Sequence, residues 1–460
     1  MKLVLRYASF CLLLLLVASA AQAAPPPSAL VQCLKEAEGD QPSQLTTYQQ
    51  FVQGQATRLT LRSGWWSDKK SLFDLSMVTG LTVTRLDQLE AQCRAWKGPL
   101  TAAVYLAVHV PPGGTKIDGP GLEAVQEAEQ KMAEFHQRME ALPNGCSLNM
   151  MLLVETVSDR VMRWMLPINV LRNYALLGAS TRLVAMVDVD LLPSVGLAEW
   201  LEMPGKMDWL EQECSQKKLF VLPAFETAEL PSMAAAHRVA AKAAASDKPG
   251  LQKMVHDHQV WQFALKIFRE GHNMTLYDKW FNSSDAYGPV GWTKDYEPWF
   301  IIDRTLTPFY DSVFRGYGWN KVTHVTHVHR QGFQFMVHPT GFLVHRQHGY
   351  TKARDTYQSS KASYEKTLLT NKAKARADRS LAATTHKFRD RVLEQLSEGR
   401  YRPALDTGLL TCLDTLPWWQ QNSSKVVASP RAVDASTMQR RLRRRQRHRR
   451  QLEQPAHPRH

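Results

Sequence analysis

The stretch Leu-Val-Ala-Met-Val-Asp-Val-Asp-Leu-Leu-Pro, residues 183–193, joins an apolar run to two acidic residues. The run from Leu183 to Val189 predicts a buried β-strand. Side chains two apart in an extended segment point to the same side, so the carboxylates of Asp188 and Asp190 can converge on one hard divalent cation. An isolated Asp-x-Asp pair is more often a solvated turn at a strand end. The surrounding sequence must decide between these interpretations.

Segments around this stretch alternate between strand and helix patterns. Apolar or β-branched runs predict strands, and apolar residues three or four apart predict helices. In chain order the expected elements are strand 76–83, helix 86–96, strand 100–110, helix 119–142, strand 147–157, helix 171–177 and strand 183–189. This alternation predicts an α/β fold with a mostly parallel mixed sheet flanked by helices. Such folds bind nucleotides at the carboxyl edge of the sheet, where the acidic pair would lie.

The pattern beyond the acidic pair is less regular. An Ala-rich stretch from Met233 to Ala245 predicts an exposed helix or a lid, and residues 351–400 have the composition of charged helices. We therefore expect one catalytic domain over residues 71–415, preceded by a short stem at residues 24–70.

The first 23 residues have the pattern of a secretory leader. Lys2 and Arg6 precede an apolar run, and small residues follow at Ala21 and Ala23. The run is shorter than the roughly 20 residues that usually span a bilayer, so residues 1–23 are expected to be a signal peptide or a signal anchor. Either would place the remainder in the secretory pathway, in the Golgi lumen, and an anchor would make it a single-pass type II membrane protein.

The formal net charge of +14 is concentrated at one end of the chain. Residues 431–460 hold ten arginines against Asp434 and Glu453. Few apolar residues accompany them, so residues 425–460 are predicted to be a disordered arginine-rich tail. Such a tail could bind an anionic polysaccharide or an anionic membrane surface. A nucleic-acid partner is not expected, because the leader points to the secretory pathway and no nucleic-acid-binding module is present.

Cysteines and glycosylation motifs fit an oxidising compartment. Beyond the leader the cysteines are at positions 33, 93, 146, 214 and 412, an odd number. One or two disulfides are expected, with partners that the sequence leaves open. Asn-x-Ser/Thr motifs occur at Asn273, Asn282 and Asn422. The absence of a Cys-x-x-Cys pair argues against a zinc site or a thiol redox site.

A series of motifs keeps a fixed order around the acidic pair. They are Leu166-Pro167-Ile168-Asn169, Leu171-Arg172-Asn173, residues 188–193, residues 221–227, Gly271-His272-Asn273 with Trp280, Tyr296-Glu297-Pro298, residues 316–321, Pro339, Phe342 and residues 345–348. Over about residues 73–350 this series resembles glycosyltransferase family 49. That family includes the β-1,4-glucuronyltransferase of dystroglycan glycosylation and the glucuronyl-transferring half of the LARGE-type bifunctional enzymes.

The resemblance implies a GT-A fold, a UDP-sugar donor with UDP-glucuronate expected, a Mn²⁺ (or Mg²⁺) ion, and inversion at the anomeric carbon. Carried onto this sequence, it implies metal ligands among Asp188, Asp190, His345 and His348. Which of the two histidines binds the metal is left open. Two departures from the family pattern are notable: Gln347 replaces a proline, and residues 338–341 read His-Pro-Thr-Gly where the family has a motif similar to Leu-Pro-Asn-Ala.

The resemblance also implies that Arg172 and Asn173, with Asp188, lie near the nucleotide, where a guanidinium can fork onto diphosphate or uracil oxygens. Inversion needs a base for the proton of the acceptor hydroxyl, and the candidates are Glu297 and Glu226. Many inverting enzymes of this fold have an acidic pair where Asn-Lys stands at residues 320–321.

The aromatic residues Trp292, Trp299, Trp319 and Phe225 are candidates for a surface on which sugars stack. The sequence thus predicts a metal-dependent inverting glycosyltransferase that extends a glycan or glycoprotein acceptor. Two alternatives stay open. One is a catalytically inactive glycan-binding protein of the same fold, and the other is a polysaccharide-associated protein that acts through its basic tail.

Overall fold

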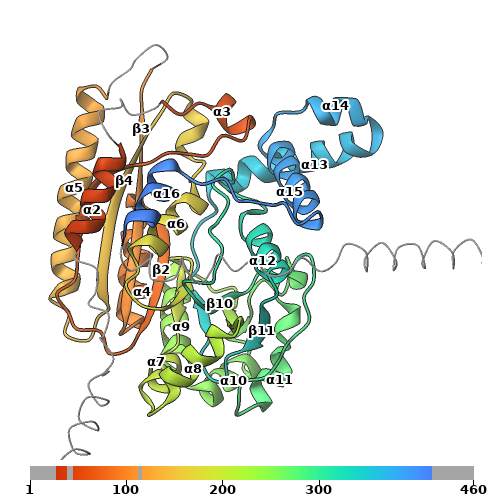
Figure 1. Ribbon diagram of the computed structural model, residues 1–460. Coiled ribbons are helices and arrows are strands. Elements are labelled where there is room, and N and C mark those ends of the chain that lie inside the picture. The colour runs from red at the N-terminus through yellow and green to blue at the C-terminus, as the bar shows by residue number, and fades with distance from the viewer. Residues whose placement is uncertain (1–26, 39–44, 112–116, 417–460) are drawn as a thin grey trace, which may run out of the picture.

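A computed structural model describes residues 27–38, 45–111 and 117–416 (Figure 1). The expected leader at residues 1–23 and the tail at residues 425–460 lie outside the described residues. No helix in the described part of the chain is long and apolar enough to cross a membrane.

The centre of the fold is an eight-stranded sheet with strand order β1-β4-β3-β2-β5-β10-β7-β11. Its strands are β1 Thr60–Trp65, β2 Leu75–Thr82, β3 Pro99–His109, β4 Ser147–Val157, β5 Leu183–Met186, β7 Lys218–Leu222, β10 Trp299–Asp303 and β11 Gln334–Val337. The run β4-β3-β2-β5 is parallel and so is β7-β11, while β1 and β10 pair antiparallel with their neighbours. This confirms the predicted α/β fold with a mixed, mostly parallel sheet.

Helices cover both faces of this sheet, because alternate residues of each strand point to opposite faces. Ala102 and Val104 of β3 pack in one core with α4 (Leu86–Ala95) and α5 (Gly119–Glu140). Ala103 of β3 packs in the core on the other face. The helices in that second core are α6 (Ile168–Gly178), α2 (Pro27–Glu38) and α16 (Thr407–Thr415). The strands and helices predicted between residues 76 and 186 are all present.

A second, four-stranded sheet has the order β6-β12-β8-β9. Its strands are β6 Leu191–Pro193, β12 Leu343–His345, β8 Ala224–Thr227 and β9 Val260–Gln262. Three of them directly continue strands of the large sheet, since β5 leads into β6, β7 into β8 and β11 into β12. Every crossing between the sheets therefore falls in the same region of the fold, and the candidate site residues lie there.

Of the remaining helices, α3 precedes β1 and all the others follow β6 along the chain. They are α3 Tyr48–Val52, α7 Val195–Glu202, α8 Lys206–Ser215, α9 Met233–Ala244, α10 Lys248–His256, α11 Tyr277–Asn282, α12 Asn320–Arg330, α13 Lys352–Thr370, α14 Lys372–Ala377 and α15 Leu381–Ser397. The charged helices expected at residues 351–400 are α13, α14 and α15. The helix expected at residues 233–245 is α9, but Ala236, Ala240 and Ala243 are buried, so one face belongs to the core.

The segment expected to be a stem at residues 24–70 is part of the folded domain. Strand β1 pairs with β4 at the edge of the large sheet. Helix α2 packs against α16 at the other end of the chain, and a disulfide joins Cys33 to Cys412. The expected domain start at residue 71 is therefore wrong. By composition alone, a short amphipathic helix and an edge strand that follow a leader resemble a stem.

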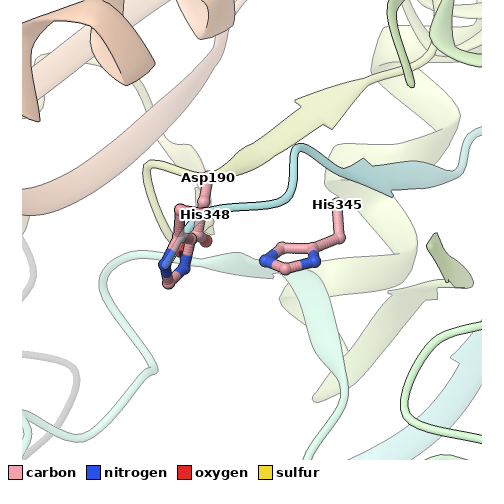
Figure 2. A group of neighbouring side chains, drawn as sticks. All are labelled: Asp190, His345 and His348. Atoms are coloured by element: carbon pink, nitrogen blue, oxygen red, sulfur yellow. Dashed lines mark hydrogen bonds and ion pairs between the residues drawn. The ribbon is translucent and has the colours of Figure 1, made fainter. Parts of the chain in front are cut away.

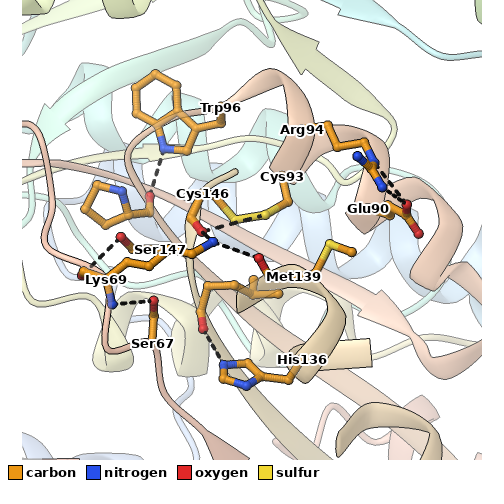
Figure 3. The surroundings of a disulfide bond; sticks show 12 residues. Ser67, Lys69, Glu90, Cys93, Arg94, Trp96, His136, Met139, Cys146 and Ser147 are labelled. Carbon is orange, nitrogen blue, oxygen red and sulfur yellow. Dashed lines mark hydrogen bonds and ion pairs between the residues drawn. A yellow bond between two sulfur atoms is a disulfide. The ribbon is translucent and has the colours of Figure 1, made fainter. Parts of the chain in front are cut away.

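A second disulfide joins Cys93 of α4 to Cys146 just before β4 (Figure 3). Lys69 lies beside it, with its ammonium group donating to the carbonyl oxygens of Cys146 and Met139. Among the described residues one further cysteine, Cys214, is buried and unpaired. Each disulfide restricts the unfolded chain, a restriction typically worth about 2–4 kcal/mol of stability.

One of the departures from the family pattern has a clear role between β11 and β12. The Nδ1 atom of His338 accepts hydrogen bonds from the backbone N–H groups of Gly341, at 2.8 Å, and Thr340, at 3.3 Å. Burial lowers the pKa of His338 to about 3, with the ammonium group of Lys248 adding to the effect. A Cβ atom at position 341 would lie 3.0 Å from His338 Nδ1 and 2.8 Å from the Leu197 side chain. His338 and Gly341 therefore depend on each other.

Because His338 is neutral in the folded protein, acid should destabilise the fold. An unfolded histidine has a pKa of about 6.5, so the stabilisation is complete above that pH and is lost as pH falls toward the folded value. At pH 5 the cost from this residue should be about 2 kcal/mol, at 1.4 kcal/mol per pH unit. Between pH 7 and pH 5, urea unfolding should show a loss about 2 kcal/mol larger in the wild type than in His338→Asn, which keeps an acceptor near the same place. An equal loss in both proteins would contradict the assignment.

Candidate active site

Asp190, His345 and His348 form a group whose potential ligand atoms all lie within 4.8 Å of one another. Figure 2 shows the His345 ring directed toward the Asp190–His348 pair. Asp190 ends the turn between β5 and β6, and both histidines come from β12 and the segment after it. The antiparallel pairing of β6 with β12 places His345 opposite Leu191, and the backbone N–H of Arg346 donates to the Asp190 carbonyl at 2.7 Å. Strand pairing thus brings residues 155 or more positions apart into one group.

The protonation states in this group suit a metal ion. Burial alone would raise the pKa of Asp190, but the hydrogen bond from His348 at 2.8 Å, His345 and Arg85 hold that pKa below its usual value. Burial also lowers the pKa of His345, against the opposing charge of Asp190. Metal ligands must be deprotonated, and an ionised carboxylate beside a neutral imidazole meets that requirement.

The donor set of one carboxylate oxygen and two imidazole nitrogens fits a divalent transition metal such as Mn²⁺. His345 supports this fit, because its Nδ1 atom is buried and has no hydrogen-bond partner among the described residues. In this structure His348 Nε2 instead contacts Asp190, and His348 Nδ1 lies 2.7 Å from the carbonyl oxygen of Gly349.

Asp188 lies in a different environment, which differs from the expectation that it shares a metal with Asp190. Its Oδ1 accepts a hydrogen bond from Arg172 at 2.8 Å, and its Oδ2 accepts one from the Trp299 indole at 3.0 Å. The ammonium nitrogen of Lys321 is 3.8 Å from the same Oδ2 atom. Strand β5 ends at Met186 and a turn follows, so the two aspartates are not on one face of an extended strand.

Arg172 and Asn173, which were predicted to contact the nucleotide, are buried in α6. Their side chains form hydrogen bonds with other groups of the protein. Arg172 also donates to the side-chain oxygens of Asn169, at 3.0 Å, and Asn320, at 2.9 Å. The Asn173 amide donates to the Tyr310 carbonyl and accepts from the Tyr310 N–H, both at 2.8 Å. Both ends of the Asn173 amide are thus engaged by the backbone of Tyr310, and Arg172 holds the carboxylate of Asp188.

Glu226 and Glu297, the two candidate bases, have different surroundings. The Oε1 atom of Glu226 accepts hydrogen bonds from the Trp261 indole and from the backbone N–H of Ala264, both at 3.1 Å. Ala264 has a positive φ of 54°, which is unfavourable for alanine. Glu226 therefore stabilises a strained turn, and this role argues against its use as the base.

Glu297 is the better placed of the two. No described group donates a hydrogen bond to its carboxylate, while its backbone N–H is fixed by the Gly271 carbonyl at 2.9 Å. Burial raises the pKa of Glu297, and the charge of Lys321 opposes that shift. Glu297 thus combines a raised pKa with proximity to Lys321 and Asp188.

Lys321 belongs to the site, although its sequence position shows only that an acidic pair is missing there. It lies in the first turn of α12, which starts after Trp319 in a left-handed conformation with φ 63°. Its ammonium nitrogen lies 3.3 Å from the centroid of the Trp299 ring. Burial lowers its pKa, against Glu297 and Asp188, which raise it. No pattern in the sequence could reveal this role, because it depends on contacts between four separate segments.

The aromatic residues proposed for sugar stacking belong mainly to the core. Trp299 and Phe225 are buried, and Trp292 stacks on His329 with ring centroids 4.4 Å apart. Trp319 is only half-buried, but Arg389 covers its ring at 4.2 Å.

Three other rings are exposed near the site: Trp164 is 43% exposed, Tyr317 41% and Tyr350 74%. Lys352 lies 4.8 Å from the centre of the Trp164 ring, and Arg354 lies 3.7 Å from that of Tyr350. Burial raises the pKa of Tyr317, as does the nearby charge of Glu297, so this surface adjoins the candidate base.

Comparison with known families identifies the chain. Residues 74–380 match the model of a family described as "Glycosyl-transferase for dystroglycan". The chain belongs to this family. The matched range covers the small sheet, every strand of the large sheet except β1, and all the site residues described above.

Curated relatives include the xylosyl- and glucuronyltransferases LARGE2s of Danio rerio, 29% identical over 67% of this chain, and LARGE1 of Homo sapiens, 28% identical over 67%. These matches cover 36% and 35% of the relatives, so the chain spans about a third of their length. Among solved structures, a mannosyltransferase from Pyrobaculum calidifontis in complex with GDP-Man and Mn²⁺ matches with a TM-score of 0.26 and 11% identity. That match covers 89% of this chain and 86% of the other.

The family departure at Gln347 is compensated within the structure. Its side-chain amide donates to the Thr227 carbonyl at 3.0 Å, and its own carbonyl oxygen is 2.8 Å from His237 Nε2. The segment between the two candidate histidine ligands is therefore tied to the end of β8 and to α9. In this member of the family, side-chain hydrogen bonds hold the segment where the family pattern has a proline.

Because Asp188 and Asp190 lie in different environments, the same substitution at each should have a different effect. Asp190→Asn removes a ligand, so it should weaken Mn²⁺ binding at least about tenfold. Asp188→Asn should have a smaller effect on Mn²⁺ binding, and it should lower stability because Arg172 loses its charged partner in a buried site. Mn²⁺ titration and thermal unfolding of both variants check this. Equal loss of Mn²⁺ affinity would contradict the assignment of Asp188 to a separate site.

Proposed function

We propose that this protein is a metal-dependent inverting glycosyltransferase that moves glucuronate from UDP-glucuronate to a glycan or glycoprotein acceptor. The observation that carries the proposal is the convergence of Asp190, His345 and His348 beside Asp188 and the candidate base Glu297. Glucuronate is the proposed sugar because relatives are named xylosyl- and glucuronyltransferases. Bound Mn²⁺ would neutralise negative charge on the donor diphosphate as UDP leaves.

The chain's own groups support the chemistry of transfer. We propose that the Glu297 carboxylate takes the proton from the attacking acceptor hydroxyl, because its pKa is raised and its oxygens accept no hydrogen bond from the described residues. Lys321 keeps positive charge between Glu297 and Asp188 and favours the ionised form of both. Arg172 and Trp299 would hold the Asp188 carboxylate in one orientation toward the donor.

We place the acceptor over the exposed rings of Trp164, Tyr317 and Tyr350. Aromatic faces pack well against sugar rings, and the neighbouring Lys352 and Arg354 supply hydrogen-bond donors for hydroxyl or acidic groups. The influence of the Glu297 charge on the pKa of Tyr317 supports an acceptor surface close to the proposed base.

We further propose a lumenal location in the secretory pathway. Two disulfides support it, because such bonds persist in oxidising compartments. Asn273 and Asn282, in two of the glycosylation motifs, are both exposed. An anionic polysaccharide or membrane surface remains the proposed partner of the arginine-rich tail.

The direct test is UDP release by the full chain from a panel of UDP-sugars, with and without Mn²⁺. UDP-glucuronate should be consumed only with Mn²⁺, and Asp190→Asn should abolish turnover. A folded protein that neither binds nor turns over any donor with Mn²⁺ would sink the transferase proposal and favour the inactive glycan-binding alternative.

The pH profile tests the base. A general base contributes about 10²–10⁴-fold, so Glu297→Gln should lower kcat by that factor, and Glu226→Gln should act mainly on stability. Because its pKa is raised, the acid limb of kcat should lie above the usual value of 4.5 for Glu, with activity rising as Glu297 ionises. The limb should disappear in Glu297→Gln. An unchanged acid limb in that variant would rule out Glu297.

A further inference from the structure

The turn that carries both aspartates is held from the side by a buried glutamine of α4. The side-chain amide nitrogen of Gln92 donates to the carbonyl oxygen of Asp188 at 3.1 Å and to that of Leu191 at 3.0 Å. The backbone N–H of Leu191 also donates to the Asp188 carbonyl, at 3.0 Å. Gln92 therefore connects the two ends of the turn, and its side chain is fully buried.

The same part of the chain contacts the other residues of the metal group. Arg85, just before α4, lies 3.6 Å from the Asp190 carboxylate. Asp87 in the first turn of α4 forms an ion pair at 3.1 Å with Arg346, which lies between the two histidines. The segment around α4 thus touches the aspartate turn and the histidine segment, although neither its sequence pattern nor its spacing suggests a site.

The position of Gln92 is itself fixed covalently. Its neighbour Cys93 is bonded to Cys146, and the backbone N–H of Cys146 donates to the Cys93 carbonyl at 3.0 Å (Figure 3). Cys146 immediately precedes β4, which pairs with a strand on each side in the large sheet. The disulfide therefore ties the helix that holds the turn to the rigid sheet.

We propose that Gln92 is a positioning residue for the metal group, and that the Cys93–Cys146 disulfide fixes Gln92 in place. This inference rests on the proposed function, since it concerns the affinity of Asp190, His345 and His348 for Mn²⁺. Gln92 does not touch the metal; it sets the backbone from which Asp190 faces the two imidazoles. Groups that orient metal ligands typically change metal affinity about 10–100-fold when they are removed.

Mn²⁺ titration of the full chain, followed by the electron paramagnetic resonance signal of free Mn²⁺, tests this without an activity assay. Gln92→Met removes both hydrogen bonds at similar volume and should raise the Kd for Mn²⁺ at least about tenfold. Gln88→Met is the matched control, because Gln88 is also buried, one turn earlier on α4, and makes no hydrogen bond to residues 188–191. Gln92→Met also leaves two buried carbonyls without this donor and should lower thermal stability more than Gln88→Met, so the Kd values are compared at a temperature where both variants are fully folded.

The two disulfides give a second comparison. Replacing Cys93 and Cys146 by serine should weaken Mn²⁺ binding, whereas replacing Cys33 and Cys412 should leave it unchanged. If Gln92→Met does not fold, Gln92→Asn is measured instead, because the shorter amide cannot reach both carbonyls and should also weaken binding. A folded Gln92 variant with the wild-type Kd would overturn this inference alone. A wild-type chain that binds no Mn²⁺ would overturn the proposed function and this inference with it.

Discussion

The structure depends on the crossing of three strands from the large sheet to the small one. Strands β5, β7 and β11 each run on into a strand of the second sheet, so their crossings lie side by side. Two of these crossings lead to Asp190 and to His345. Backbone hydrogen bonds of the sheets therefore determine the distance between the candidate metal ligands, and side chains only refine it.

The charged side chains buried beside these crossings lie next to side chains of opposite charge. Arg172 and Lys321 lie next to Asp188 and Glu297, and Trp299 supplies a further hydrogen bond to Asp188. An unpaired charge in such a place would be costly, so each member holds its neighbours in a charged state. Glu297 differs from the others in that its carboxylate accepts no hydrogen bond from the described residues and burial raises its pKa.

Where the sequence departs from the family pattern, other contacts hold the same segments in place. The ring of His338 accepts backbone hydrogen bonds in the turn, and the space it occupies explains the glycine at position 341. Gln347 supplies side-chain hydrogen bonds where the family has a proline. The histidine segment is consequently held in place in this chain by a different set of interactions.

The sequence by itself determined the α/β fold, most of its elements, the family and the segments that meet at the site. These follow from local patterns: hydrophobic periodicity specifies strands and helices, and ordered motifs specify a family. Only the tertiary structure separated Asp188 from Asp190, assigned Asn173 and Glu226 to structural hydrogen bonds, and revealed Lys321 and Gln92. These roles depend on a turn after β5 and on side chains from distant segments. Spacing along the chain carries no information about such contacts, because they form only when the sheets pack.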